Sequence, residues 1–373
     1  MHLTLQAHCG PIWWTPLLLI ILLSCKPQEP AYTTRFTAFG TRIDLTVIGI
    51  DRDTFDHVSE AIQSDFAFMH NAWHAWDPGP LGRVNQLLVS GEEFSVPPSV
   101  YPLIRQGQIL AANSEDLFNP AIGRLIDAWG FDSSDPQQYK VPDPEVIARL
   151  VDANPRMSDL VLHGILLRST NPAVQLDFGG FGKGYAIDLA IDHLRELGVN
   201  NAIINAGGDM RAIGSRDGHP WRIPIRRPSG SGVFATIRVK GDESVFTSAS
   251  YEQDFVFEGK TYHHIIDPRT GYPAAGVRSV TVVHREAITA DAAANALFIA
   301  GPEHWQEIAR SMGIEYVLLV DSKGVLHMNP EMQDRIELLD QNIKVRIGPH
   351  LRHRGGASGA EWSQNTGTAL TQH

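Results

Sequence analysis

The pattern of hydrophobic and polar positions predicts a mixture of strands and helices along most of the chain. Between residues 35 and 50 the apolar side chains Ile43, Leu45 and Val47 alternate with polar ones, which is typical of a strand, and Gly40-Thr41 interrupts it. Across residues 52–73 the apolar positions step by three or four, which predicts an amphipathic helix. Because strands and helices do not alternate strictly, the pattern favours the α+β class.

The same reasoning places the remaining elements. Asp143 and Thr289 suit helix N-caps, and Gly198 suits a helix end. A turn is expected at 77–80. Further helices are expected at 100–113, 144–151, 183–197, 289–299 and 302–312. Further strands are expected at 160–168, 174–176, 202–205, 222–226, 233–239, 262–266, 277–283 and 316–320. Residues 348–373 are rich in Gly, Ser, Thr and Gln, which predicts a disordered tail.

The first residues form an apolar segment typical of an export signal. No Asp, Glu, Lys or Arg occurs before Lys26, and residues 17–23 are an unbroken run of Leu and Ile. This run is shorter than the roughly 20 apolar residues that cross a bilayer, but it suits the hydrophobic region of a signal peptide. It ends in Leu22-Leu23-Ser24-Cys25, which is similar to a bacterial lipobox. Residues 1–24 are therefore predicted to be a lipoprotein signal peptide and Cys25 the lipidated residue; a plain hydrophobic anchor or an incorrectly assigned start is the alternative.

Composition narrows the class of protein. The only cysteines are Cys9 and Cys25, so cleavage before Cys25 leaves no disulfide, and the core has to hold the exported domain together. We expect a polar tether at 25–34 and one folded domain at 35–347. The formal net charge of −11 argues against a nucleic-acid partner. It also means that an anionic nucleotide would need a metal ion or local backbone amides to neutralise its phosphates.

Two glycine-rich segments are candidates for binding phosphate. Residues 177–188 join a strand to a helix through Gly179, Gly180, Gly182 and Gly184. Such a junction can direct backbone N–H groups and a helix N-terminus at phosphate, although it fits neither the Walker nor the dinucleotide pattern, and a tight turn explains it equally well. The second segment, residues 206–209 with Gly207-Gly208, also reads as an ordinary hairpin turn.

Two further segments carry candidate catalytic and metal-binding residues. In an extended segment His263 and His264 point to opposite sides, so only one of them can face a site. A single His is more often structural. Asp291 and Asn295 are four positions apart on a predicted helix, so they share a face, and oxygen ligands of this kind suit a hard cation such as magnesium. Alternatively, Asp291 only complements the helix dipole.

Taken together and in order, these segments resemble the ApbE family of FAD:protein FMN transferases. The resemblance runs from about Phe36 to Asp321, and the blocks at 177–188 and 264–273 are its most specific part. The matching blocks are Phe39-Gly40-Thr41, Arg83-Val84-Asn85, Phe118-Asn119-Pro120, Trp129-Gly130-Phe131, residues 177–188, Gly207 to Arg211, residues 264–273 and Ala290-Asp291. The chain departs from the family pattern at Asn119, where Asp is common, at Ala249, where Gly is usual, and at Asn295, where Thr is frequent.

The resemblance implies a fold, a reaction and a set of site residues. The fold would be α+β, with a T-fold-like mixed sheet, flanking helices and an FAD cleft between two subdomains. His264 would be the catalytic base, and Mg²⁺ would be held by Asp291, Asn295 and the carbonyl of Gly182. The residues expected to bind FAD are Gly40, Asp177, Gly179, Gly180, Lys183, Gly207, Gly208, Asp209, Ile265, Asp267, Thr270 and Gly271. Lys183 touches phosphate or, equally, forms an ion pair with Asp177 or Asp188.

The implied reaction is transfer of FMN from FAD to a Thr or Ser hydroxyl of an acceptor protein, with release of AMP. The expected acceptor is an exported subunit of a membrane redox complex, and the expected location is the periplasmic face of a bacterial membrane, reached through the lipid anchor. Whether that is the inner or the outer membrane stays open. Two alternatives also stay open: an FAD pyrophosphatase that gives FMN and AMP, and a lipoprotein that only binds FAD.

Overall fold

The computed structural model describes residues 29–133, 135–228, 231–340 and 343–351. The predicted signal peptide, the lipidation site Cys25 and most of the predicted tail lie outside these residues. Of the tail positions that are described, Leu351 is buried in the main core, so the folded part extends past the predicted boundary at 347. At the other end, the first strand begins at Ala31, four residues before the predicted start of the domain.

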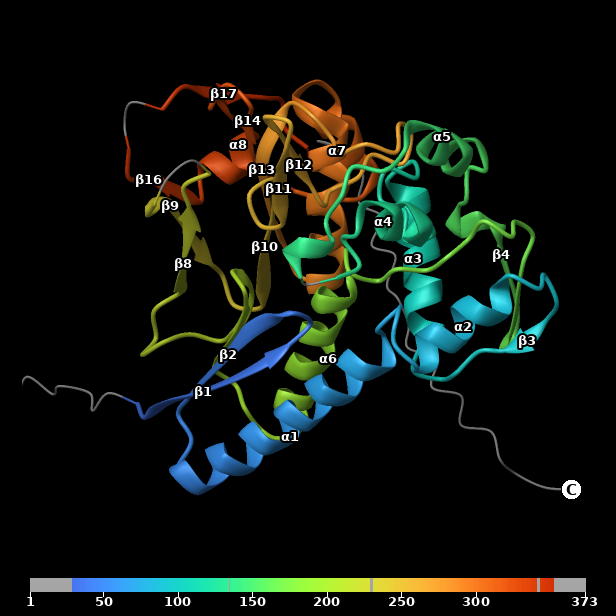
Figure 1. Cartoon of the computed structure of the whole chain (residues 1–373). Helices are drawn as coiled ribbons and strands as arrows, with labels where there is room; N and C mark the ends of the chain where they lie inside the picture. The colour runs from blue at the N-terminus through green and yellow to red at the C-terminus, as the bar shows by residue number, and fades with distance from the viewer. Residues whose placement is uncertain (1–28, 134, 229–230, 341–342, 352–373) are drawn as a thin grey trace, which may run out of the picture.

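Within the described residues, nine strands form the central sheet (Figure 1). Their order is β1 (Ala31–Ala38), β2 (Thr41–Ile48), β6 (Ala202–Ala206), β7 (Asp209–Ile213), β10 (Glu243–Ala249), β13 (Val277–His284), β14 (Tyr316–Asp321), β15 (Leu326–Met328) and β17 (Val345–Ile347). Neighbouring strands are antiparallel except β15 and β17, which pair in parallel. The mixed α+β sheet expected from the sequence is therefore confirmed.

Each face of this sheet is covered by a different layer. Helices α1 (Arg52–Ala72), α6 (Gly182–Glu196) and α7 (Ala287–Ser311) share the large core on one side. On the other side, a small sheet of β8 (Trp221–Arg226), β9 (Val233–Val239) and β16 (Ile336–Leu338) packs against the strands through a second core. Because both faces are buried, central strands such as β10 and β13 have buried residues at consecutive positions.

A second lobe lies beside the main body, to the right in Figure 1. It comprises α2 (Pro80–Leu88), α3 (Tyr101–Asn113), α4 (Gly123–Trp129), α5 (Pro144–Asp152) and the sheet of β3 (Phe94–Ser95), β4 (Leu160–His163) and β5 (Leu166–Ser169). The hairpin of β11 (Asp254–Phe257) and β12 (Lys260–His263) packs on α4, where Tyr262 contacts Trp129. The short helix α8 (Pro330–Gln333) and 3₁₀ turns at Pro136–Gln138 and Met157–Asp159 complete the described elements.

Most of the predicted elements are present, with informative exceptions. The helix predicted at 52–73 is observed as α1, and Asp143 caps α5 as expected, accepting from the N–H of Glu145 at 2.8 Å. Helices 289–299 and 302–312 are two halves of α7, separated by Gly301 at φ 76°. The prediction that Thr289 caps this helix is wrong, because α7 begins at Ala287. Helices α2 and α4 were not predicted, and residues 160–168 form a hairpin rather than one strand.

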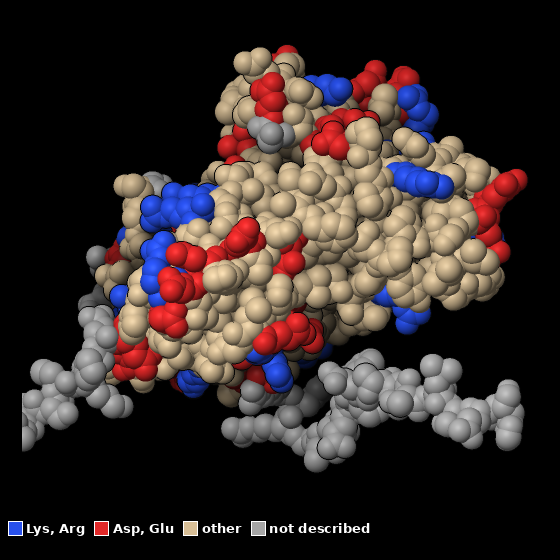
Figure 2. Space-filling model, turned by 90° about the horizontal axis from the view of Figure 1, so that it is seen from below, with Lys and Arg blue, Asp and Glu red and all other residues tan. Residues whose placement is uncertain are grey.

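The surface is mixed in charge. On the face shown in Figure 2, Lys and Arg side chains lie in small groups beside Asp and Glu rather than in one continuous basic area. Among the helices of the described residues, none combines the length and the apolar character that crossing a membrane requires.

Candidate functional site

The predicted site residues converge on one large cavity between the main body and the second lobe. Its volume is about 910 Å³, which lies within the usual range for a cofactor-sized ligand. The lining includes the β1–β2 turn, the glycine-rich segment, the start of α6, the N-terminal half of α7 and the residues after β12. The predicted residues that line it are Gly40, Asp177, Gly179, Gly180, Gly182, Lys183, Gly207, Asp209, His264, Ile265, Asp291 and Asn295.

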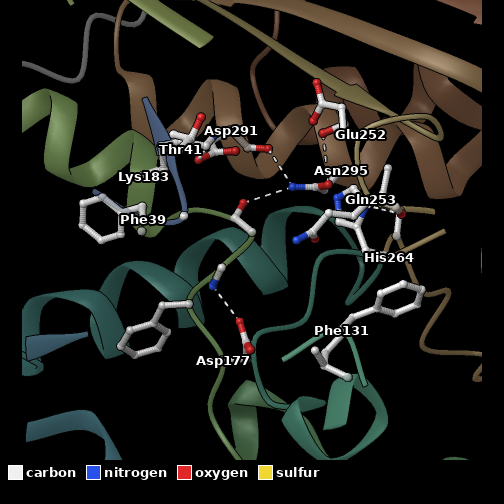
Figure 3. A pocket seen from close by; sticks show the side chains of 18 of the residues that line it. Phe39, Thr41, Phe131, Asp177, Lys183, Glu252, Gln253, His264, Asp291 and Asn295 are labelled. Atoms are coloured by element: carbon white, nitrogen blue, oxygen red, sulfur yellow. Dashed lines mark hydrogen bonds and ion pairs between the residues drawn. The ribbon is translucent and has the colours of Figure 1, made fainter. Parts of the chain in front are cut away.

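The glycine-rich segment crosses the cavity between Asp177 and the start of α6 (Figure 3). Asp177 accepts from the N–H of Gly179 at 2.6 Å, which forms a tight turn. The strand predicted at 174–176 before it is wrong, because only Gln175 makes an isolated bridge, to Ile122. Burial raises the pKa of Asp177, and the hydrogen bonds from Gly179 and from the Trp76 side chain oppose this rise. Asp177 therefore shapes the loop, while the backbone of the loop faces the cavity.

Lys183 lies between two buried carboxylates. Its Nζ forms an ion pair with Asp209 and lies 3.7 Å from Oδ2 of Asp291. Burial opposes the charge on Lys183, but the two carboxylates outweigh it and raise the lysine pKa. The expectation that Lys183 pairs with Asp177 or Asp188 is wrong, because the sheet brings Asp209 of β7 to the start of α6, and no local spacing encodes that contact.

Asp291 is buried, with 5% of its surface exposed, and its carboxylate shares the charge of Lys183 with Asp209, so one lysine faces two carboxylates. Burial raises its pKa to about 7, Asp209 adds to this rise, and Lys183 opposes it. Oδ2 of Asp291 accepts from the backbone N–H of Gly184 at 3.0 Å. Because a bound cation would stabilise both carboxylates, their shared excess charge fits a cation site.

Asn295 lies one turn beyond Asp291 on α7, as predicted (Figure 3). Its amide donates to the carbonyl of Gly180 at 3.0 Å, and its oxygen accepts from the hydroxyl of Ser248 at 3.0 Å. In the part of the chain that the structure describes, no three or more His, Cys, Asp or Glu side chains are grouped to hold a metal. A cation here would therefore need amide, carbonyl or substrate oxygens beside Asp291, which suits Mg²⁺.

His264 faces the cavity, and its neighbour His263 faces the core. Nε2 of His263 contacts the carbonyl of Ala274 at 2.9 Å, and its ring packs on Phe298. Nδ1 of His264 contacts the carbonyl of Gln253 at 3.3 Å. Because a carbonyl only accepts, Nδ1 carries the proton, and the neutral ring keeps Nε2 free to take another. Burial lowers the pKa of His264 to about 4, so the ring is neutral at pH 7.

Four predicted FAD-binding residues do not line the cavity. Gly208 lies behind Gly207, where its N–H donates to the side chain of Asn205 at 2.9 Å. Asp267 closes a turn by accepting from the backbone and guanidinium of Arg269, and Thr270 is exposed on that turn. Gly271 has φ +73°, and a Cβ there would lie 2.5 Å from Ile147. The turn at 267–271 therefore packs against α5, outside the lining of the cavity.

Aromatic residues form a wall that sequence reasoning did not identify. Phe39 stacks on Trp73 with ring centroids 6.0 Å apart, and Trp73 also contacts Tyr185. Phe39, Trp73 and Trp76 all line the cavity. The signal in the sequence was the spacing of Trp73 and Trp76 at the end of α1, which reads equally well as core. Flat apolar faces of this kind suit the planar rings of a flavin or an adenine.

The comparisons with known proteins agree with this geometry. Residues 39–318 match the family model described as the ApbE family. The chain belongs to the ApbE family. It is 39% identical over 318 residues to the FAD:protein FMN transferase of Rhodobacter capsulatus, covering 85% of this chain and 61% of that protein. It is 32% identical to the FAD:protein FMN transferase of Vibrio cholerae, covering 64% of this chain and 72% of that protein.

Solved structures of ApbE proteins share the fold. The ApbE protein of Thermotoga maritima matches with a TM-score of 0.75 at 30% identity, covering 82% of this chain and 99% of its own. The flavin transferase ApbE of Vibrio cholerae matches with a TM-score of 0.71 at 27% identity, with the same coverage of both chains.

The structure accommodates the three departures from the ApbE pattern, and it explains the one at Asn119 most directly. The Asn119 side chain donates to the carbonyl of Pro155 at 2.8 Å and accepts from the N–H of Ala121 at 3.0 Å. A carboxylate at this position has no proton to give Pro155, so only the amide makes both contacts. At Ala249, which is fully buried in β10, the extra methyl group is accommodated inside the core. The change at Asn295 keeps an oxygen at the cavity but adds the bond to Gly180.

Proposed function

We propose that this chain transfers FMN from FAD to a Thr or Ser hydroxyl of an acceptor protein, with AMP as the leaving group. The observation that carries the proposal is the shared cavity: a neutral His264 faces the same space as the buried group of Lys183, Asp209 and Asp291. One side of the cavity can accept a proton, and the other can bind the cation that a charged pyrophosphate requires. The names of the curated relatives support the same reaction.

The chemical step needs a base for the acceptor hydroxyl. As the hydroxyl oxygen attacks the FMN phosphorus, an O–P bond forms and the P–O bond to AMP breaks. The hydroxyl proton goes to Nε2 of His264, and the bond from Nδ1 to Gln253 holds the ring in the required tautomer. AMP leaves with the electron pair of the broken bond. The proton then passes from His264 to solvent, which restores the neutral ring.

We infer that a magnesium ion is held by Asp291, by the amide oxygen of Asn295 and by the carbonyl of Gly182. When bound, such an ion neutralises the pyrophosphate and the charge that develops on the leaving group. Support comes from the two carboxylates, Asp209 and Asp291, that share the single charge of Lys183, and from the position of Asn295 and Gly182 in the lining beside Asp291. Lys183 keeps Asp209 in place beside them.

The proposed location is the periplasmic face of a bacterial membrane, with a lipid on Cys25 as the anchor and a subunit of a membrane redox complex as the acceptor. The lipobox-like sequence before Cys25 supports the anchor. A Cys25→Ser variant should move from the membrane fraction to the soluble fraction and keep its activity. Continued extraction only by detergent argues against the lipid.

The transfer itself is tested by mass spectrometry of a candidate acceptor incubated with FAD, Mg²⁺ and the full chain in detergent. We expect the acceptor mass to increase by that of FMN less one water, on a Thr or Ser, with one AMP per event. The matched control is the His264→Ala protein. Free FMN and AMP with an unmodified acceptor would make the chain a pyrophosphatase, and intact FAD would make it a binding protein.

A further inference from the structure

The two helices that carry the cation site cap each other's N-terminus. On α7, Asp291 accepts from the N–H of Gly184 in the first turn of α6 at 3.0 Å. On α6, Asp188 accepts from the N–H groups of Ala287 and Ile288, the first residues of α7, at 2.7 and 2.9 Å. Neither helix has a capping hydrogen bond from its own N-cap side chain. Each therefore obtains the acceptor for its unpaired N–H groups from the other.

Gly184 makes this exchange possible. A Cβ at that position would lie 2.5 Å from the carbonyl oxygen of Ala287 and 2.9 Å from Cβ of Asp291. Any other residue would push the two helices apart, because these contacts are with backbone and with the base of a side chain. The crossing at Gly184 therefore fixes how closely Asp291 approaches the start of α6.

Asp188 also forms a buried ion pair with Arg211. Arg211 of β7 pairs with Asp188, and its Nε and Nη2 also bond Asp242 at 3.0 and 2.9 Å. The Arg211 side chain is only 6% exposed. Burial raises the pKa of Asp188 to about 6, and Arg211 together with the two amides of α7 opposes this rise. The central sheet is thus connected through Arg211 and Asp188 to the first turn of α7.

We infer that Asp188 and Arg211 are positioning residues for Asp291, and that they set the affinity of the chain for a divalent cation. Asp291 begins the second turn of α7, three residues after Ile288, so the anchored amides fix its place along the helix axis. Neither Asp188 nor Arg211 lines the cavity. Their effect on the cation therefore passes through the helix. The inference rests on the proposed cation site at Asp291.

The test measures binding of Mn²⁺ alone to the full chain by electron paramagnetic resonance. Losing a residue that supports a metal ligand typically weakens metal affinity by about 10–100-fold, and we expect Asp188→Ala to raise the Kd for Mn²⁺ within this range. The matched control is Asp51→Ala. Asp51 caps the start of α1 through the N–H of Thr54 at 2.8 Å, at the end of that helix remote from Trp73. Asp51→Ala should lower the thermal stability without changing the Kd for Mn²⁺.

Arg211→Lys is a second variant, which tests the inference if Asp188→Ala does not fold. Lysine keeps the buried charge but cannot bond Asp188 and Asp242 at once, so it should weaken Mn²⁺ binding in the same direction. Wild-type affinity for Mn²⁺ in a folded Asp188→Ala or Arg211→Lys protein overturns the inference, as does a wild type that binds no Mn²⁺. If the wild type transfers no FMN but the variants lose Mn²⁺ affinity as expected, the proposed reaction is overturned and the positioning role of Asp188 and Arg211 remains.

Discussion

Two walls of the cavity carry ionisable groups, and they hold these groups in different ways. On the helix wall, formed by the first turn of α6, the N-terminal half of α7 and Asp209 of β7, Lys183 forms an ion pair with Asp209 and lies 3.7 Å from the carboxylate of Asp291. On the hairpin wall, formed by Gln253 and His264 at the base of the β11–β12 hairpin, the imidazole is tuned mainly by burial and by one carbonyl bond. A change on the helix wall should therefore alter binding and chemistry together, whereas a change on the hairpin wall should alter chemistry alone.

The largest effect is expected at His264. Loss of a general base commonly costs about 10²–10⁴-fold in rate, so His264→Ala should reduce kcat of FMN transfer within this range and leave the Kd for FAD nearly unchanged. The control is His263→Ala, which loses the bond to Ala274 and should reduce thermal stability while transfer continues. The flavin fluorescence of the acceptor measures the transfer rate. A normal rate in His264→Ala refutes the assignment of His264 as the base.

Asp291 tests the helix wall. Removing one electrostatic contact to a developing charge costs about 10²–10³-fold, and Asp291→Ala should lose this much turnover together with affinity for Mg²⁺ and FAD. Asp291→Asn is the sharper variant, because its oxygen can still accept from Gly184 while the charge is gone. Calorimetric titration of each protein with FAD, in the presence and absence of Mg²⁺, measures the FAD affinity and its dependence on Mg²⁺. Equal FAD affinity in the two conditions would contradict the proposed cation site.

The pH profile tests the hairpin wall through His264. An ordinary His loses its proton near pH 6.5, but burial lowers the pKa of His264 to about 4. The base must be unprotonated, so kcat/KM should not fall with His264 protonation until the pH approaches 4, and should then fall about tenfold per pH unit. Initial rates at a fixed Mg²⁺ concentration, with circular dichroism to follow folding, measure this. A fall in kcat/KM below about pH 6–7 that is seen in the wild type and is absent from His264→Gln would mean that bound FAD raises the pKa of His264 and so reverses the effect of burial.

The smallest effect on chemistry is expected at Gly271. It was predicted to bind FAD, but it packs against Ile147 at φ +73°, with its carbonyl accepting from Trp129 at 2.9 Å. Gly271→Ala should cost about 1–3 kcal/mol of folding stability, through backbone strain and crowding. Urea denaturation measures that loss, and fluorescence titration should give an unchanged Kd for FAD. A weaker Kd in the folded variant would return Gly271 to the binding site.

Local signals in the sequence were sufficient for most elements. The three-to-four spacing of apolar residues predicted α1 to within one residue at its end, and the short strand expected at 233–239 between Gly- and Pro-containing breaks is β9. The prediction of a strand at 262–266 is wrong beyond His263, because β12 pairs only with β11 and the chain then turns into the cavity wall. Helix α4 has seven residues, too few for a periodic pattern to be distinctive.

The site was predicted from motifs, but its contacts were not. The cap of α7 comes from Asp188, about a hundred positions earlier in the chain, so Thr289 was chosen as the local candidate. The partner of Lys183 is Asp209, which only the folded sheet brings close. Residue type and spacing therefore indicated which groups are present, while the choice of partner was made by the tertiary fold.

The exchange of caps between α6 and α7 also has a consequence for folding. The bonds from Ala287 and Ile288 to Asp188, and from Gly184 to Asp291, join segments 99 to 107 residues apart in sequence. Such contacts carry a high loop-closure cost and form only once the intervening strands are arranged. The N-termini of α6 and α7 are then capped in the same folding step. Asp291 therefore reaches its native position only when both helices are in place. The amide protons of these three residues should accordingly exchange with deuterium together, through one cooperative opening.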